Sequence, residues 1–423
     1  MRQAPISISI SFILSLVSLT ICQAATVETF VTPDSGFDAL SRFISNSNSS
    51  IVIATYTFTS PEILSMLLGR GAEGVSISVL VEKSPAGGRP EGEDGILCAL
   101  ARRNASVMLY DGPLRYMHAK YMVSDGKAAL VTSENLGRSG FSPGADYGNR
   151  GWGAIIRDSA IPGMLARVFS EDRGHATDIA CKPGESFKAN DAARRGAYSG
   201  RFSTGFFRDQ DVALVTSPDS LEPLLALIGS ANESVLVQQL YVYSHWGSPK
   251  YDTVASAPSP LLDALIAKAR QGVDVRILLD SSDFNMENDS SVSNLQTIAH
   301  VNGIAASEGI PIVAKAIDLR GLGLAEAHNK GIVVDGKAAL VSSINWNENS
   351  VRSNREAGLI IIGEAAGYYE KAFMSDWGGA PVMNAGDVQG FGPVPAALSA
   401  LALAVIFILI YLGSRRDKHP VDL

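Results

Sequence analysis

Two stretches of this 423-residue chain decide its fold: MHAKYMVSDGKAALVTSEN at residues 117–135 and AHNKGIVVDGKAALVSSIN at residues 327–345. The segment DGKAALV is identical in both. Each copy reads His-x-Lys-x4-Asp and then, further on, Ser-x-Asn. The matched residues are His118, Lys120, Asp125, Ser133 and Asn135 in the first copy, and His328, Lys330, Asp335, Ser343 and Asn345 in the second. A pattern of this length that occurs twice indicates an internal repeat.

The repetition extends to both sides of these stretches. Before each copy the pattern predicts a short strand, a helix, an apolar strand, a second helix opened by Ser-Pro, and another strand. After each copy it predicts an apolar strand and a helix with the sequence Phe-x-x-Asp. The apolar strands are expected at residues 51–56, 75–81 and 154–156, and at 235–241, 273–279 and 357–362. Such alternation predicts an α/β fold of two repeats, with mixed sheets flanked by helices.

The segments between these elements set the expected domain boundaries. We expect the first repeat at residues 26–180, a surface linker rich in Gly, Arg and Ser at 181–210, and the second repeat at 211–380. A second irregular stretch, residues 285–306, interrupts the second repeat. It either shapes a substrate entrance or is a solvated insertion.

Both ends of the chain carry signals for membrane targeting. Residues 1–25 combine one early cation, an apolar stretch and a small-residue exit, which predicts a cleaved signal peptide, with an uncleaved anchor as the alternative. Residues 394–412 are uncharged and long enough to cross a bilayer, with a buried soluble helix as the alternative. The basic residues within 413–423 predict a cytoplasmic tail. We therefore expect an extracytoplasmic body that is anchored to the membrane by a C-terminal helix.

Charge and cysteine content limit the classes of function. The chain has 35 Lys and Arg against 43 Asp and Glu, and four of the basic and two of the acidic residues lie in the terminal segments. The body therefore has a net charge of −10, whereas proteins that clamp long nucleic acids without sequence preference are usually basic. Cys98 and Cys181 form either one disulfide or two separate buried thiols.

The motif residues are suited to phosphodiester chemistry. Cleavage takes a nucleophile, a proton donor for the leaving oxygen, and positive charge around the non-bridging oxygens. One histidine can attack phosphorus to form a phosphohistidine while the other protonates the leaving alcohol. Side chains alternate along a strand, so a lysine two residues after each histidine lies on the same face. The two lysines offset the phosphate charge, Asn135 and Asn345 add amide donors, and we expect no metal or other cofactor.

The remaining motif residues have structural alternatives. Ser133 and Ser343 either position the lysine or the phosphate, or stabilise a turn. Asp125 and Asp335 each precede a glycine, and an Asp in such a turn usually accepts hydrogen bonds from the backbone. We therefore expect Asp125 and Asp335 to be structural.

The paired motif resembles the double signature of the phospholipase D superfamily, and the resemblance extends from about residue 27 to residue 377. It implies two αβ repeats related by a pseudo-twofold axis, one active site at their interface, and no metal cofactor. It also implies that His118 is the nucleophile and His328 the general acid. Asn149 and Asn354 would add hydrogen-bond donors for the substrate.

The resemblance has one departure. The second repeat reads SNRE at residues 353–356, where Glu356 matches the acidic residue that orients a motif histidine. The first repeat reads GNRG at residues 148–151, with Gly151 in place of the acid. Either Asp146 or another group replaces the carboxylate, or His118 works unassisted. This leaves open which histidine attacks, and whether the enzyme is slow or specialised.

The motif predicts the reaction but not the substrate, because proteins with this resemblance include phospholipases, cardiolipin-type synthases and nucleases. We expect a phospholipid substrate, since the body is acidic and held at a bilayer where lipid headgroups are concentrated. A membrane-anchored extracytoplasmic nuclease is the main alternative, and a non-catalytic receptor or scaffold is a minor one. The sequence gives no oligomeric state.

Overall fold

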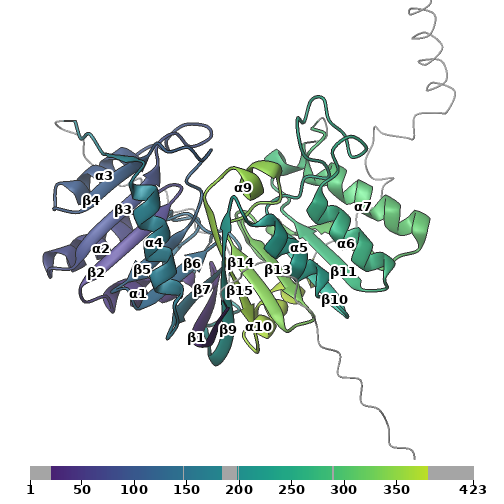
Figure 1. Ribbon diagram of the computed structural model, residues 1–423, viewed down its shortest axis with the longest axis horizontal. Coiled ribbons are helices and arrows are strands. Elements are labelled where there is room, and N and C mark those ends of the chain that lie inside the picture. Colours follow the sequence, from purple (N-terminus) through teal and green to yellow (C-terminus); the bar gives the residue numbers. More distant parts are fainter. Residues whose placement is uncertain (1–20, 146, 183–197, 199, 288–289, 380–423) are drawn as a thin grey trace, which may run out of the picture. The chain divides into compact units, whose positions relative to one another are not determined.

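The computed structural model describes residues 21–145, 147–182, 198, 200–287 and 290–379 (Figure 1). The first repeat contains strands β1 (Ile21–Thr32), β2 (Ser50–Thr55), β3 (Ser76–Glu82), β4 (Ser106–Tyr110), β5 (Tyr121–Ser124), β6 (Ala128–Thr132), β7 (Gly151–Arg157) and β8 (Ala176–Asp178). Its helices are α1 (Gly36–Ser45), α2 (Pro61–Ala72), α3 (Glu93–Ala101) and α4 (Ile161–Arg173).

The second repeat follows the same plan. Its strands are β9 (Gly205–Ser217), β10 (Ser234–Gln239), β11 (Asp274–Leu279), β12 (Ile312–Ala316), β13 (Lys330–Val334), β14 (Ala338–Ser342) and β15 (Glu356–Ile362). Its helices are α5 (Leu221–Gly229), α6 (Pro260–Arg270), α7 (Asn294–Glu308), α8 (Leu319–Leu322), α9 (Glu348–Arg352) and α10 (Ala366–Gly379). Strand β9 begins inside the segment that was expected to be a linker.

All fifteen strands in the described residues form one mixed sheet. From the centre outward, the first repeat contributes β1-β7-β6-β5-β2-β3-β4-β8 and the second contributes β9-β15-β14-β13-β10-β11-β12. Apart from β8, the two halves have the same order. The repeats join through antiparallel pairing of β1 with β9, and the strands β2, β3 and β4 are parallel, as are β10, β11 and β12. The predicted α/β fold of two repeats is therefore confirmed.

Three apolar cores hold the helices on the sheet. One packs α1, α2 and α3 against the first repeat, and another packs α5, α6 and α7 against the second. The third extends across both repeats and includes α4 and α10. In this shared core the rings of Trp152 and Tyr369 lie 5.0 Å apart. Because one core spans both repeats, we infer that they fold as one unit.

The two Ser-Pro pairs open helices as predicted. Ser60 caps α2 by accepting a hydrogen bond from the backbone N of Ile63 at 3.3 Å, and Ser259 caps α6 in the same way. Proline suits the position after the cap because its missing N–H has no partner there in any helix.

The prediction that residues 285–306 are irregular was wrong. Most of this stretch belongs to α7, which Ser293 caps by accepting from the backbone N of Gln296 and which ends at Gly309 in the left-handed conformation. Only a narrow face of α7 is buried, and it consists of Asn294, Thr297, Ile298 and Val301. The rest of the helix is polar or small, so its apolar periodicity is weak and the sequence resembles a loop.

The predicted membrane segments lie largely outside the described residues. The stretch 394–412 is not described, and of residues 1–25 only 21–25 are, as the start of β1. In the part of the chain that the structure describes, no helix is long and apolar enough to span a bilayer.

The structure decides between the two alternatives for the cysteines. Cys98 in α3 and Cys181, beyond β8, form a disulfide that joins positions 83 residues apart. A cross-link of this span restricts the unfolded chain strongly.

We expect the double variant Cys98→Ser/Cys181→Ser to lower the free energy of unfolding by about 2–4 kcal/mol, because the unfolded chain regains the freedom that the disulfide removed. Urea denaturation of the variant and of the wild type, with and without reductant, measures this. Reductant should weaken the wild type and leave the variant unchanged. Equal midpoints for oxidised wild type and variant would contradict the expectation.

Candidate active site

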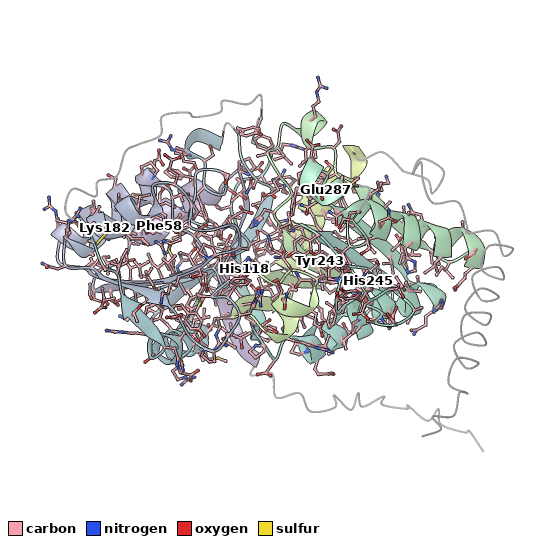
Figure 2. The ribbon with its side chains drawn as sticks, turned by 90° about the horizontal axis from the view of Figure 1, so that it is seen from above. Phe58, His118, Lys182, Tyr243, His245 and Glu287 are labelled. Carbon is pink, nitrogen blue, oxygen red and sulfur yellow. A yellow bond between two sulfur atoms is a disulfide. The ribbon has the colours of Figure 1, made fainter. Side chains whose placement is uncertain are left out.

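The two motif histidines lie just before β5 and β13, next to the boundary between the repeats. Figure 2 shows His118 where the blue first repeat meets the green second repeat. Backbone hydrogen bonds cross this boundary: the N of His118 donates to the O of Arg355 at 2.9 Å, and the N of Arg355 donates to the O of Tyr116 at 2.8 Å. On the opposite side, the N of Arg150 donates to the O of Glu326 at 2.8 Å. These bonds fix each histidine segment against the other repeat.

Each motif lysine is buried beside its histidine. The Nζ atom of Lys120 donates to the carbonyl O of His118 at 2.6 Å, and Lys330 bonds the carbonyl of His328 in the same way. Burial lowers the pKa of Lys120 to about 7 and that of Lys330 to about 8. The positive charge of Lys330 also lowers the pKa of His118 and of Lys120.

His118 pairs with a carboxylate from the other repeat. Its Nδ1 lies 2.9 Å from Oε2 of Glu356, which is fully buried at the start of β15. Ser343 donates to the same Oε2 at 2.6 Å, and the amide of Asn354 donates to Oε1 at 3.0 Å. Burial lowers the pKa of His118 to about 4, although the charge of Glu356 opposes this shift. His118 is therefore neutral at neutral pH, as a nucleophile must be.

His328 has the reciprocal partner, which the sequence did not reveal. Its Nδ1 lies 3.3 Å from Oε1 of Glu134, which is ion-pair distance without hydrogen-bond geometry, and this buried nitrogen makes no hydrogen bond to any described residue. Ser133 donates to Oε1 of Glu134 at 3.3 Å and Asn149 donates to Oε2 at 3.1 Å. Burial disfavours ionisation of Glu134, but the charges of His328 and Lys330 keep its pKa below the ordinary value.

Each histidine lies beside a glutamate of the opposite repeat, and this crossed pairing determines which histidine is affected by the missing acid at Gly151. The sequence placed the missing acid beside His118, whereas the structure gives His118 the carboxylate of Glu356. Position 151 belongs instead to the half-site of His328. Asp146, the other expected replacement, lies outside the described residues.

The residues expected to bind substrate fall into two groups. One group donates hydrogen bonds to the two glutamates that contact the histidines, and these donors are therefore not free to bind a ligand. This group contains Ser133, Ser343, Asn149 and Asn354. Asn135 and Asn345 differ, because neither side-chain amide makes a hydrogen bond to any described residue. Buried polar groups in native structures are usually bonded. These two amides are therefore available to a ligand.

The aspartates of the two motifs turn away from the histidines and bond the backbone. Asp125 accepts from the N atoms of Asn48, Ser49 and Ser50, and Asp335 accepts from three equivalent N atoms at residues 232–234. Both have positive φ and begin the turn between the motif strands. Their contacts are those of structural residues.

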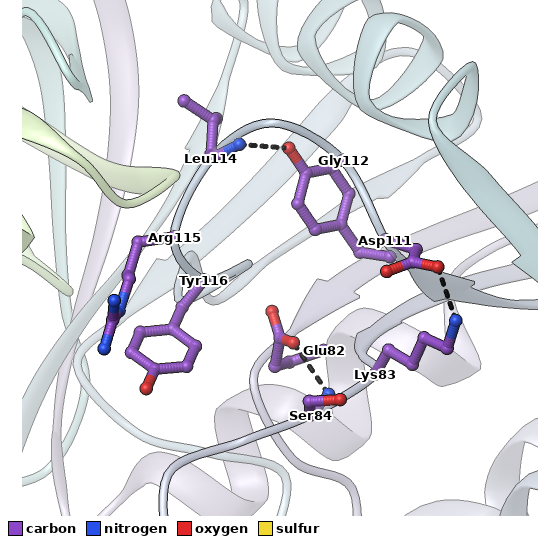
Figure 3. Close-up of a pocket in the computed structure, with 9 residues that line it drawn as sticks. Glu82, Lys83, Ser84, Asp111, Gly112, Leu114, Arg115 and Tyr116 are labelled. Atoms are coloured by element: carbon purple, nitrogen blue, oxygen red, sulfur yellow. Dashed lines mark hydrogen bonds and ion pairs between the residues drawn. The ribbon is translucent and has the colours of Figure 1, made fainter.

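A pocket of about 280 Å³ lies beside the His118 half-site, at the carboxyl ends of β3 and β4 (Figure 3). Glu82 is buried in its wall and accepts from the N of Met117, next to His118, at 2.7 Å. Arg115 lies over the ring of Tyr116, 5.4 Å from its centroid, and makes no side-chain hydrogen bond or ion pair to any described residue. The lining residues are Glu82, Lys83, Ser84, Tyr110, Asp111, Gly112, Leu114, Arg115 and Tyr116. The wall of this pocket is thus polar and charged.

An aromatic ring packs against His118. The rings of Tyr56 and His118 are 4.6 Å apart, edge to face, and Tyr56 in turn contacts Tyr116. Among the described residues, no group of three or more His, Cys, Asp or Glu side chains is placed to hold a metal ion. The centre contains two imidazoles, each beside a buried carboxylate, together with the side chains of two lysines and two asparagines.

Comparison with known proteins gives one match to a family. Residues 40–173 and 224–377 match the family described as cardiolipin synthase, PLD-like domain. Among solved structures, phosphatidylserine synthase from Haemophilus influenzae Rd KW20 is similar with a TM-score of 0.62 at 14% identity, over 92% of this chain and 97% of that chain. Nuc from Salmonella typhimurium, a phospholipase D family member, has a TM-score of 0.33 at 16% identity, over 37% of this chain and 98% of that chain. No curated protein matches the sequence.

Proposed function

Since the chain belongs to the phospholipase D superfamily, we propose that it is a phosphodiesterase or phosphatidyltransferase that acts on phospholipids through a phosphohistidine. The observation that carries this proposal is the pair of histidines, each backed by a buried carboxylate from the opposite repeat. An imidazole whose Nδ1–H points at a carboxylate presents Nε2 for chemistry.

The reaction then has two steps. In the first, Nε2 of His118 attacks phosphorus, the bond to the leaving oxygen breaks, and Nε2–H of His328 protonates the departing alcohol. In the second, neutral His328 takes a proton from water or an acceptor alcohol, whose oxygen attacks phosphorus and breaks its bond to His118. Lys120 and Lys330 hold the non-bridging oxygens, and Asn135 and Asn345 donate to them.

Three features support a phospholipid as the substrate. The body carries a net charge of −10, which repels extended nucleic acid. The pocket beside His118 is lined with charged and polar groups, which suit a headgroup or an acceptor alcohol better than an acyl chain. The expected C-terminal anchor would hold the centre at a bilayer surface.

We also propose that the catalytic body is extracytoplasmic. The disulfide between Cys98 and Cys181 supports this, because disulfides persist mainly in oxidising compartments. External protease added to intact cells should then degrade the body. Protection until the membrane is permeabilised would contradict this location.

The substrate is tested with the full-length protein in liposomes, in the presence of a chelator. A headgroup-labelled phospholipid and a labelled single-stranded oligonucleotide are offered separately, beside His118→Ala and His328→Ala. We expect headgroup release in the wild type alone, with added primary alcohol competing with water. Cleavage of the oligonucleotide alone would favour the membrane-anchored nuclease, and inactivity on both would favour a non-catalytic scaffold.

The pH dependence follows from the pKa values of the centre. A protonated His118 cannot attack, so kcat/KM is expected to fall as the pH drops toward about 4. An uncharged lysine cannot hold the phosphate, so kcat/KM is also expected to fall as the pH rises through about 7 to 8. A soluble phosphodiester assayed across this range measures both limbs. An activity that keeps rising into strongly alkaline pH would contradict the assignment of the lysines.

A further inference from the structure

Position 151 is where the two repeats differ most sharply at the centre. Strand β15 begins at Glu356 and the equivalent strand β7 begins at Gly151. At the end of each motif, before these strands, the second repeat reads Ser343-Ile344-Asn345 and the first reads Ser133-Glu134-Asn135. The first repeat thus has no carboxylate at residue 151, where the second repeat has Glu356. It has a carboxylate at residue 134, where the second repeat has the apolar Ile344.

The carboxylate of Glu134 fills the space that a side chain at residue 151 would need. A Cβ atom built on Gly151 would lie 2.1 Å from Oε1 of Glu134 and 2.5 Å from Oγ of Ser133. At contacts this short something must shift, so a side chain at residue 151 would displace the carboxylate of Glu134 and the hydroxyl of Ser133. A Cβ atom on Gly140 would lie 2.7 Å from the backbone O of Asn135 and 2.9 Å from Cβ of Glu134. Two glycines therefore make room for Glu134.

The bonding of Glu134 reproduces that of Glu356. Each carboxylate accepts from the serine of its own motif and from the asparagine that precedes the arginine of its own repeat. Each faces Nδ1 of the histidine in the opposite repeat. The equivalent of Glu134, Ile344, instead packs in the apolar core of the second repeat.

We propose that Glu134 and Gly151 have exchanged roles, so that Glu134 supplies from a new position the carboxylate that positions His328. This inference rests on the proposed function, in which His328 is the general acid and base. Glu134 does not touch the reacting atoms; it fixes the proton on Nδ1 of His328 and stabilises the imidazolium that protonates the leaving alcohol. The 3.3 Å separation can shorten when a phosphate binds, as such contacts often do.

The sequence of the second repeat suggests the decisive variant. Glu134→Ile/Gly151→Glu gives the first repeat the arrangement of the second. We expect Glu134→Gln to lower turnover of an alkyl phosphodiester by about 10²–10³-fold. The exchanged double variant should recover to within about tenfold of the wild type, whereas Gly151→Glu alone should not fold well, because two side chains compete for one space. Glu93→Gln, which alters a buried carboxylate that accepts from the N of Phe58, is the matched control and should keep its activity.

A second readout is independent of activity. In protein labelled with ¹⁵N-histidine, the long-range ¹H–¹⁵N spectrum reports which ring nitrogen of His328 holds the proton, with His328→Asn identifying its signals. We expect Nδ1–H in the wild type and the double variant, and a mixture of tautomers in Glu134→Gln. If the wild type cleaves no phosphodiester, the proposed function fails while this spectrum still decides the role of Glu134. Wild-type turnover and an unchanged tautomer in Glu134→Gln would overturn the inference.

Discussion

The His118→Asn variant is expected to release no p-nitrophenol from a p-nitrophenyl phosphodiester, whereas His328→Asn is expected to release about one equivalent per protein and then stop. An asparagine at residue 118 has no nucleophilic nitrogen, so the phosphohistidine cannot form. p-Nitrophenolate is stable enough to leave without a proton, so the first step does not need His328. The second step does, because water must lose a proton to attack.

The contrast between the two variants assigns the roles of the histidines. With an alkyl phosphodiester, whose leaving oxygen needs a proton, both variants should lose at least about 10³-fold in turnover. His328→Asn quenched in alkaline denaturant, in which phosphohistidine is stable, should carry the labelled phosphoryl group on residue 118, which mass spectrometry of its peptides locates. A burst in His118→Asn and none in His328→Asn would reverse the assignment. The neutral state of His118, with its pKa lowered to about 4 by burial, favours it as the nucleophile.

The sequence predicted a centre with the two histidines, the two lysines and Glu356, but it predicted neither Glu134 nor which histidine each glutamate contacts. The spacing of His118 and Lys120 is a property of one strand, so it can be read from one segment. The contact of His118 with Glu356 joins residues 238 positions apart and depends on how the repeats face each other. The same crossing explains why the absence of an acid at Gly151 was assigned to the wrong histidine.

Glu134 could have been found by comparing the two repeats with each other. Between Ser and Asn, the first motif has Glu134 and the second has Ile344, and this is the reverse of the difference between Gly151 and Glu356. The two differences are opposite in direction and lie in the same half-site. They therefore indicate that residues 134 and 151 have exchanged the carboxylate. Helix α7, by contrast, could not be predicted from its own sequence pattern, because its buried face is too narrow to give a clear apolar periodicity.

The arginines before residues 151 and 356 form a second pair of crossed contacts. Arg150 is fully buried, with its Nε 2.9 Å from Oδ2 of Asp376 in α10 and its Nη1 bonded to Asp34. In the mirror position, Arg355 makes a two-pronged contact with Asp172 in α4 at 2.9 Å. Each arginine thus joins its own repeat to the terminal helix of the other.

We expect Arg150→Met to lower the free energy of unfolding by about 3–5 kcal/mol, since it leaves two buried carboxylates without their cation. Converting Asp34 and Asp376 to Asn in the same chain should restore part of the loss, because neutral amides tolerate burial better than unpaired charges. Urea denaturation measures both variants. Lys337→Met, which removes an ion pair exposed at both ends, is the control and should leave the midpoint nearly unchanged.

The same experiment tests whether the repeats unfold together. The shared core and the two crossed arginine contacts predict one cooperative transition, in which tryptophan fluorescence and circular dichroism change at the same urea concentration. Arg150→Met should shift that transition without splitting it, because the contact of Arg355 with Asp172 still joins the repeats. Two separate transitions in the wild type would show that each repeat is stable alone. A centre whose histidines take their carboxylates from opposite repeats requires the single transition, since separation of the repeats breaks both pairs at once.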